Sequence, residues 1–183
     1  MSKIKVAMVG GGIGGFIGEI HRAAMRLDDR FELVAGALSS DATRAMESAK
    51  ELGVRGYESW QALLEKEQDT VDCVVIVTPN DSHAEIATAA LEAGYYVILD
   101  KPMTRTLDEA IALTAVAATS NGKLAMTYTY TGYPMVREMR KRILNGEIGK
   151  VRTVSVDYRQ GWLAEPIEQE GQKQASWRTD PQK

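Results

Sequence analysis

The feature that most constrains this chain is a run of glycines between an apolar segment and a helical pattern. Gly10, Gly12 and Gly15 have the spacing G-x-G-x-x-G. Before them, residues 4–9 form a short, mostly apolar run of the kind that is buried in a parallel sheet. Around and after them, apolar residues recur at three- and four-residue steps, as on one face of a helix: Ile13, Phe16, Ile17, Ile20, Ala24 and Leu27. The glycines therefore lie where a strand turns into a helix.

This position of the glycines predicts a binding site for a dinucleotide. A glycine at position 10 permits a tight turn, one at 12 lets a pyrophosphate approach the backbone, and one at 15 lets helix and strand pack closely. The free amides and the positive dipole end of the new helix then face the phosphates. We predict that Gly10, Gly12, Ile13, Gly14 and Gly15 bind the cofactor.

Two other interpretations of this stretch are a glycine-rich turn without a ligand and a secretory signal. The signal interpretation starts from Lys3 and Lys5, which precede an apolar stretch. Against it, the glycine run is followed by Glu19 and Arg22, and no small-residue cleavage pattern is present.

Composition narrows the classes of protein to which the chain can belong. The 183 residues are 44% hydrophobic and 26% charged, as in an ordinary soluble globular protein. A net charge of −3 provides no field for nucleic acid or an anionic membrane, and no apolar run approaches the length of a membrane span. The one cysteine, Cys73, lies in an apolar run, which excludes an intrachain disulfide and fits a reducing compartment. We expect a cytoplasmic protein without a metal site, nucleic-acid partner or membrane contact.

Strand and helix patterns alternate along most of the chain. The predicted strands are 4–9, 31–38, 54–57, 73–77, 96–99 and 123–127. The predicted helices after the first are about 41–52, 59–67, 82–93, 106–120 and 135–145, two of which begin at capping-box pairs, Ser82 with Glu85 and Thr106 with Glu109. This alternation with short loops predicts an α/β fold, a doubly wound parallel Rossmann sheet.

The end of the second predicted strand bears on the choice of cofactor. In dinucleotide folds an acidic residue stands there when the adenosine ribose carries no phosphate. Here Leu38, Ser39 and Ser40 occupy the position, and no carboxylate appears before Asp41. Ser39 and Ser40 can donate to a 2′-phosphate and Arg44 can add charge, or these residues only cap the next helix. We therefore predict NAD or NADP as cofactor, with a slight preference for NADP.

The rim of the predicted site is formed by residues that follow the apolar strand 73–77. Ligands of doubly wound sheets bind beyond the carboxyl ends of the strands, which places Thr78, Pro79 and Asn80 beside the cofactor. His83 is either a solvated residue in the first turn of a helix or a residue at the mouth of the site.

The pattern changes in the last third of the chain. A basic cluster at 137–142 is interpreted as a solvated helix face, with contact to nucleic acid as the alternative. Val151–Tyr158 alternates apolar and polar residues, which predicts a strand with one open face and the beginning of a second, α+β domain. We place the domains at 1–132 and 133–183. An unpaired edge on that strand predicts association between copies, or disorder beyond about residue 150.

Four motifs occur in one order: Gly10–Gly15, Thr78-Pro79-Asn80, Asp100-Lys101-Pro102 and Tyr128–Pro134. In this combination the chain resembles the Gfo/Idh/MocA family, NAD(P)-dependent oxidoreductases that act on sugars, inositols and related polyols. The resemblance covers nearly the whole chain. It implies a small-molecule polyol or sugar substrate and a homo-oligomeric full-length protein.

The resemblance also implies roles for residues at the end of the fifth strand. Asp100, Lys101 and Pro102 match the family's Glu-Lys-Pro with a shorter carboxylate, and all three are expected at the cofactor. Lys101 matches the catalytic lysine that reaches the reacting hydroxyl and the nicotinamide ribose. An ammonium there stabilises an oxygen that becomes partly anionic; a surface lysine is the alternative. A cis Lys101–Pro102 bond is implied as well.

Substrate contacts are implied for aromatic residues and one arginine further along the chain: Tyr128, Tyr130, Trp162, Trp177 and Arg178. The two tryptophans and the arginine are equally interpretable as core or surface residues. Family members run to about twice this length, and their catalytic Asp and His follow the equivalent of 177–181. His21 and His83 do not match that histidine, so we interpret the chain as truncated, cofactor-binding and catalytically incomplete. The alternatives are a non-catalytic dinucleotide sensor or corepressor on the same fold and, more remotely, a methyltransferase.

Overall fold

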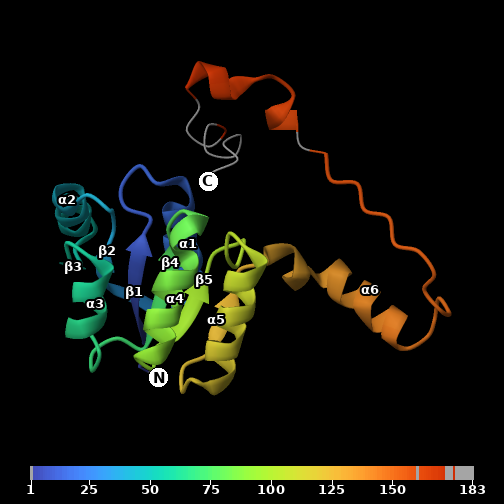
Figure 1. Cartoon of the computed structure of the whole chain (residues 1–183), viewed down its shortest axis with the longest axis horizontal. Helices are drawn as coiled ribbons and strands as arrows, with labels where there is room; N and C mark the ends of the chain where they lie inside the picture. The colour runs from blue at the N-terminus through green and yellow to red at the C-terminus, as the bar shows by residue number, and fades with distance from the viewer. Residues whose placement is uncertain (1, 160, 172–174, 176–183) are drawn as a thin grey trace. The chain divides into compact units, whose positions relative to one another are not determined.

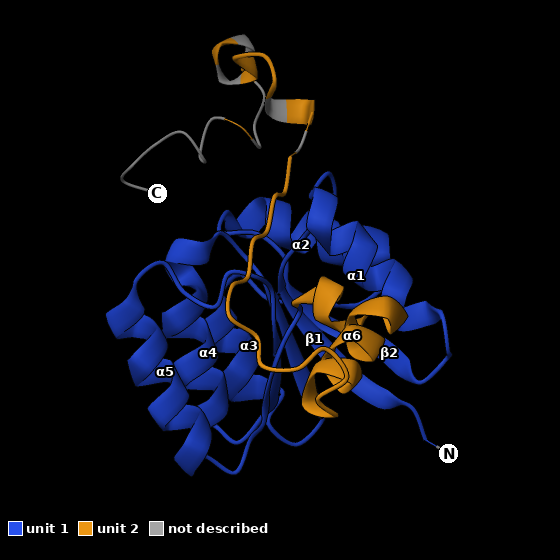
Figure 2. Cartoon of the chain, turned by 90° about the vertical axis from the view of Figure 1, so that its right-hand side faces the viewer, with its two compact units in different colours: residues 1–127 blue, residues 128–183 orange. Residues whose placement is uncertain are grey.

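The computed structural model describes residues 2–159, 161–171 and 175, and Figure 1 shows the course of the chain. The chain divides into two compact units, residues 1–127 and 128–183, which Figure 2 draws in different colours. The first unit carries the sheet and the glycine loop. Among the described residues, no helix has the length and apolar character needed to cross a lipid bilayer.

The first unit is built on a six-stranded sheet in which each neighbouring pair of strands is parallel. Its strands are β1 (Ile4–Gly10), β2 (Phe31–Ala37), β3 (Arg55–Gly56), β4 (Cys73–Val77), β5 (Tyr96–Leu99) and β6 (Leu124–Met126). Its α-helices are α1 (Phe16–Arg26), α2 (Ala42–Leu52), α3 (Trp60–Lys66), α4 (His83–Glu92) and α5 (Leu107–Thr119).

The strand order, β3-β2-β1-β4-β5-β6, identifies the fold. The chain adds β2 and β3 on one side of β1 and then crosses to add β4, β5 and β6 on the other side. This is the doubly wound Rossmann order, and it reverses direction between β1 and β4. The predicted fold class is confirmed, and the crevice at the carboxyl ends of β1 and β4 is where such sheets bind ligands.

Alternate residues of the central strands contribute to two separate cores, one on each face of the sheet. In β1, Ala7 and Val9 pack with residues of α3, α4 and α5, whereas Val6 and Met8 pack with residues of α1 and α2. All five residues of β4 are buried. A strand with helices on both faces has no polar side, which explains the uninterrupted apolar run 73–77.

Several helix ends follow the sequence signals closely. Asp41 accepts a hydrogen bond from the Arg44 amide and caps α2, which ends at Gly53 with φ of 68°. In α5 both halves of the Thr106–Glu109 capping box are present. The box predicted at Ser82 is wrong, because the Ser82 hydroxyl instead donates to Pro79 O at 2.8 Å and does not cap α4.

Helix α1 does not bury the apolar face that its periodicity indicates. Phe16 is 68% exposed and Leu27 86% exposed, while Gly18, Arg22 and Met25 are the buried residues. The helix lies so close to the first loop that a glycine, rather than a large apolar side chain, occupies the contact.

One carboxylate is buried beside the short strand β3. Glu67, 1% exposed, accepts hydrogen bonds from Arg55 Nε at 2.6 Å and Nη2 at 2.8 Å, and from the Tyr57 hydroxyl at 2.7 Å. Thr70 Oγ1 also donates to it. Hydrogen bonds from Arg55 outweigh burial and lower the pKa of Glu67 to about 2. The network joins the end of α3 to the edge of the sheet.

The second unit contains a 3-10 turn at Thr129–Gly132, helix α6 (Pro134–Leu144) and two further 3-10 turns at Gly161–Leu163 and Ile167–Glu170. The strand predicted at Val151–Tyr158 is absent, and residues 151–159 carry no regular secondary structure. Alternation alone does not make a strand, because its amides and carbonyls need a neighbouring strand to pair with.

Candidate functional site

The glycine loop adopts a backbone that other residues rarely take. Gly10, Gly11 and Gly14 have φ of 80°, 68° and 78°. A side chain at Gly10 or Gly11 would also meet neighbouring atoms, whereas Gly14 has open space around it. The loop thus needs glycine for its conformation at all three positions.

The structure shows what surrounds the other two glycines of the motif, Gly12 and Gly15. A Cβ at Gly12 would lie 2.6 Å from Leu38 O, so this glycine lets the loop pack against the end of β2. Gly15 allows a turn, with its amide donating to Gly12 O at 2.9 Å. The close contact between α1 and the loop is made by Gly18, whose Cβ would strike the backbone of Gly11. The sequence signal that points to Gly18 is a glycine inside the helical pattern, three residues beyond the motif.

The N-terminus of α1 has the properties expected of a phosphate site. Gly15 is its N-cap and provides no side-chain hydrogen bond, in contrast to Asp41, Ser59 and Thr106 on α2, α3 and α5. The first amides of a helix have no intrahelical acceptor, and here no side chain caps them. They fit a diphosphate, which accepts such hydrogen bonds at the positive end of the helix dipole.

A buried arginine lies behind this loop. Arg22, 8% exposed, donates from Nη1 to the carbonyl of Gly11. Burial lowers the pKa of its guanidinium from the ordinary value. The residue fixes the orientation of the Gly11 peptide and adds positive charge behind the loop, a role that the sequence pattern did not indicate.

The residues predicted to select the cofactor lie beside the same loop. The Gly12 amide donates to Leu38 O at 3.0 Å, which joins the end of β2 to the loop. Ser39 Oγ accepts the Asp41 amide at 3.1 Å, while Ser40 and Arg44 are exposed. Asp41, the nearest carboxylate along the chain, is occupied as the cap of α2.

The rim after β4 is held by side chains of the following turn. The Ser82 and Thr78 hydroxyl oxygens lie 2.8 Å apart, and Asn80 begins a 3-10 turn at Asn80–Ser82. His83 is 1% exposed, so its interpretation as a solvated residue is wrong. Its ring nitrogens lie 2.8 Å from Pro102 O and 2.9 Å from Thr78 O.

The motif at the end of β5 combines an anchored carboxylate with an exposed lysine. Asp100 Oδ1 accepts a hydrogen bond from Thr127 Oγ1 at 2.8 Å and lies 3.9 Å from His21 Nε2. Burial tends to raise the pKa of Asp100, but His21, Thr127 and the Lys101 amide together hold it below its ordinary value. Lys101 and Pro102 are exposed, and the peptide between them is cis. His21, which had no assigned role, therefore supports the carboxylate.

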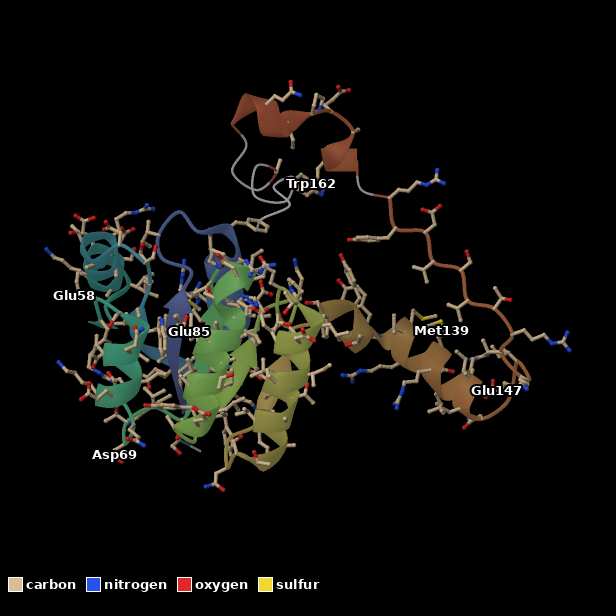
Figure 3. The ribbon with its side chains drawn as sticks, viewed as in Figure 1. Glu58, Asp69, Glu85, Met139, Glu147 and Trp162 are labelled. Carbon is tan, nitrogen blue, oxygen red and sulfur yellow. The ribbon has the colours of Figure 1, made fainter. Side chains whose placement is uncertain are left out.

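The residues predicted to contact substrate fall in the second unit. Tyr128 and Tyr130 are exposed, and the Tyr130 ring packs edge-on against Tyr133 and Tyr158. Trp162 is 38% exposed, and Figure 3 labels it with the exposed Met139 of α6. Trp177 and Arg178 lie outside the described residues.

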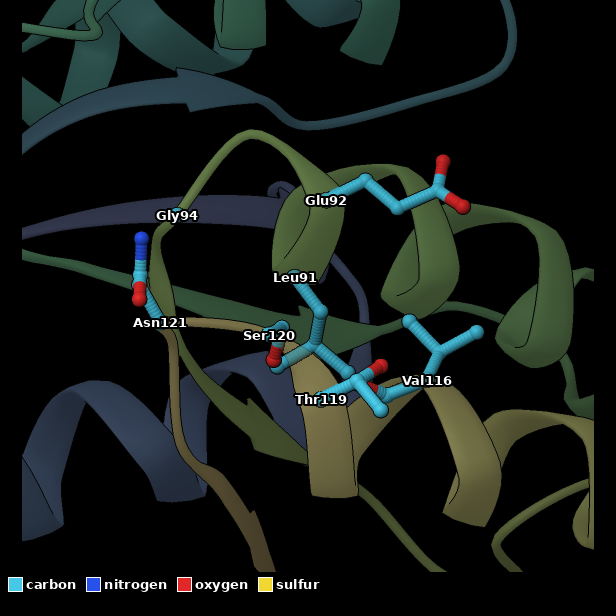
Figure 4. A pocket seen from close by; sticks show the side chains of 7 residues that line it. All are labelled: Leu91, Glu92, Gly94, Val116, Thr119, Ser120 and Asn121. Atoms are coloured by element: carbon cyan, nitrogen blue, oxygen red, sulfur yellow. The ribbon is translucent and has the colours of Figure 1, made fainter.

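Three other kinds of site are a metal centre, a reactive thiol and a separate pocket, and the structure tests each in the part of the chain that it describes. It contains no group of His, Cys, Asp and Glu side chains suited to a metal ion. Burial raises the pKa of the Cys73 thiol to about 11, as expected of an unreactive core residue. A hollow of about 320 Å³ lies between α4 and α5 (Figure 4), but Gly94 and Asn121 on its lining precede β5 and β6, at the amino ends of the strands. Ligands of this fold bind at the opposite ends.

Comparison with known proteins identifies the family. A sequence model of an oxidoreductase family with an NAD-binding Rossmann fold, GFO_IDH_MocA, matches residues 4–128. The chain belongs to the Gfo/Idh/MocA family. The match confirms the predicted resemblance and spans the glycine loop, the β4 rim and the Asp100-Lys101-Pro102 turn.

Individual members of the Gfo/Idh/MocA family are similar over nearly the whole chain. An inositol dehydrogenase homolog from Azotobacter vinelandii, solved in complex with NAD+, is 40% identical with a TM-score of 0.89, covering 98% of this chain and 48% of its own. An uncharacterized oxidoreductase, YfiI, of Bacillus subtilis (strain 168) is 37% identical, over 97% of this chain and 47% of its own length. Levoglucosan dehydrogenase of Pseudarthrobacter phenanthrenivorans is 32% identical, over 91% of this chain and 43% of its own length. The chain spans about half the length of these relatives.

Proposed function

We propose that this chain is the dinucleotide-binding part of a dehydrogenase that oxidises a secondary alcohol of a sugar, inositol or related polyol. The observation that carries the proposal is the position of two features at the same edge of one parallel sheet. The glycine loop with the uncapped start of α1 follows β1, and Lys101 follows β5, two strands away in the sheet order. Relatives named inositol and levoglucosan dehydrogenase support the substrate class.

The residues of the chain then divide the work of binding and catalysis. The first amides of α1 bind the diphosphate, and Arg22 holds the loop from behind through the Gly11 carbonyl. When bound, the nicotinamide supplies the carbon that accepts the hydride. The ammonium of Lys101 stabilises the negative charge that develops on the substrate oxygen as its proton passes to a general base, the role of the histidine that family members carry after the equivalent of residues 177–181. Thr127, His21 and the Lys101 amide hold the pKa of Asp100 below its ordinary value, so the carboxylate beside the lysine in sequence stays charged.

We further propose that the cofactor site favours NADP over NAD. A carboxylate at the end of β2 would repel a 2′-phosphate, and residues 38–40 contain none. Ser39 and Ser40 offer hydroxyl donors there, and the exposed Arg44 in the first turn of α2 offers a cation. An arginine is suited to phosphate because its planar donors match two phosphate oxygens.

Titration with NADPH and NADH, followed by the fluorescence of the reduced nicotinamide, tests both parts. We expect saturable binding of both, with NADPH bound more tightly. Arg44→Gln should lower the affinity for NADPH by about tenfold, because the charge-assisted contact between the guanidinium and the 2′-phosphate is lost. The affinity for NADH should stay within about twofold. Lys50→Gln, which removes an exposed cation in the last turn of the same helix, serves as the control. A folded sample that binds neither dinucleotide contradicts the proposal.

Hydride transfer is tested with a panel of polyols and sugars, using the longest product of the reading frame that contains this chain. Lys101→Met should lower the rate by about a hundredfold, much more than it lowers NADPH affinity, because the lysine acts mainly on charge that develops in the transition state. An unchanged rate would remove Lys101 from the mechanism.

A further inference from the structure

His83 joins two segments of the candidate site that are distant in sequence. It is the first residue of α4, and its ring is enclosed in the protein. Nδ1 lies 2.8 Å from the carbonyl of Pro102, and Nε2 lies 2.9 Å from the carbonyl of Thr78. A neutral imidazole carries one N–H and donates to one of the carbonyls at a time, whereas the imidazolium donates to both. The ring thus spans the gap between the β4 rim and the β5 turn.

The contact to Pro102 matters because of the residue before it. Lys101 is exposed on a turn, between Asp100 and Pro102. Asp100 is fixed on one side, since its amide donates to Ile76 O at 3.0 Å and its carboxylate accepts from Thr127. The Pro102 carbonyl, held by His83, fixes the other side. The backbone that carries the lysine is therefore tethered at both ends.

We propose that His83 is a positioning residue for Lys101, acting through its hydrogen bond to the carbonyl of Pro102. The inference rests on the proposed function, in which Lys101 meets the reacting hydroxyl. A lysine side chain has four methylene groups and defines the place of its ammonium only if its backbone is fixed. A displacement of about 1 Å at a reacting group is enough to cost about a hundredfold in rate. The bond to Thr78 keeps the turn in register with the rim beside the cofactor.

Two substitutions separate the two hydrogen bonds. The side-chain amide of His83→Asn lies near the position of Nδ1 and can still donate to Pro102, while that of His83→Gln lies near the position of Nε2 and can still donate to Thr78. Amide hydrogen exchange of residues 101–104 is measured in the whole chain without ligand, through the amides of 101, 103 and 104 because Pro102 has none. Residues 74–76 of the buried strand β4 are the internal reference. Glu85→Gln, an exposed change in the first turn of α4 (Figure 3), is the matched control.

We expect His83→Gln to speed exchange at 101–104 by about fivefold to tenfold, the effect of losing one buried hydrogen bond. His83→Asn and Glu85→Gln should stay within about twofold of the original chain, and exchange at 74–76 should not change in any variant. The proposal is overturned if His83→Asn and His83→Gln have equal effects, or if His83→Gln has no effect. It is also overturned if exchange at 74–76 becomes faster in parallel, as it would on loss of the fold. Because the readout needs no ligand, its failure is distinguishable from failure to bind NADPH or NADH.

Discussion

Replacing the buried Glu67 with glutamine tests how the edge of the sheet is held. The carboxylate accepts two hydrogen bonds from Arg55, one from Tyr57 and one from Thr70. A glutamine keeps the shape of the side chain but turns one acceptor into a donor, which then faces a donor of Arg55 or Thr70. We expect the free energy of unfolding at neutral pH to fall by about 2 kcal/mol.

The magnitude follows from the pKa of Glu67, which is about 2 in the folded chain against an ordinary value of 4.5. At ~1.4 kcal/mol per unit, this difference corresponds to about 3 kcal/mol of stabilisation, and the half-exposed Arg55 reduces it toward 2 because water screens part of the attraction. A folded pKa below the unfolded one stabilises the fold above pH 4.5, and this stabilisation is lost as the pH falls toward 2.

Urea denaturation followed by tryptophan fluorescence, repeated from neutral pH to about pH 3, measures this dependence. The difference between the original chain and Glu67→Gln should be greatest at neutral pH and shrink as the pH falls below 4.5. Glu65→Gln, an exposed change on the same helix, should cost less than about 0.5 kcal/mol at any pH. A difference between Glu67→Gln and the original chain that is independent of pH would refute the electrostatic origin.

Two further substitutions test the glycine loop and a helix cap. Gly18→Ala should lower the free energy of unfolding by about 1–3 kcal/mol and the affinity for NADPH by at least about tenfold, because the added Cβ would strike the backbone of Gly11. Gly132→Ala is the control and should change neither quantity, because the Cβ added there meets no atom. Thr106→Ala should cost about 1 kcal/mol in urea denaturation, since it removes one half of the capping box of α5, and a loss below about 0.3 kcal/mol would contradict that role.

The elements that the sequence predicted best are those whose signals are local. Strands Cys73–Val77 and Tyr96–Leu99 match residue for residue, because each is a short, largely apolar run bounded by turn residues. Asp41 and Thr106 mark helix starts, because an N-cap side chain binds an amide only three residues further along the chain. Gly53 marks the end of a helix, because it takes the left-handed backbone that glycine favours. The parallel, doubly wound sheet was predicted from the alternation of strand and helix.

The features that were missed depend on contacts between distant residues. The periodicity of α1 indicated Phe16 and Leu27 as one apolar face, yet the opposite side, with Gly18, lies on the loop. A histidine in the first turn of a helix is ordinarily solvated. His83 is buried between two carbonyls, those of Thr78 and Pro102, which lie five and nineteen residues away and 2.9 and 2.8 Å from its ring nitrogens. Val151–Tyr158 has the alternating pattern of a strand, yet residues 151–159 carry no regular secondary structure.

The glycine loop also makes this part of the molecule thermodynamically responsive to a ligand. Six of the nine residues from Gly10 to Gly18 are glycines. Ordering a glycine costs about 0.5–1 kcal/mol more in conformational entropy than ordering an alanine. Together these six glycines therefore oppose folding by several kcal/mol. Any anion that binds the ordered loop shifts this balance by mass action, so the melting temperature should climb with the concentration of dinucleotide.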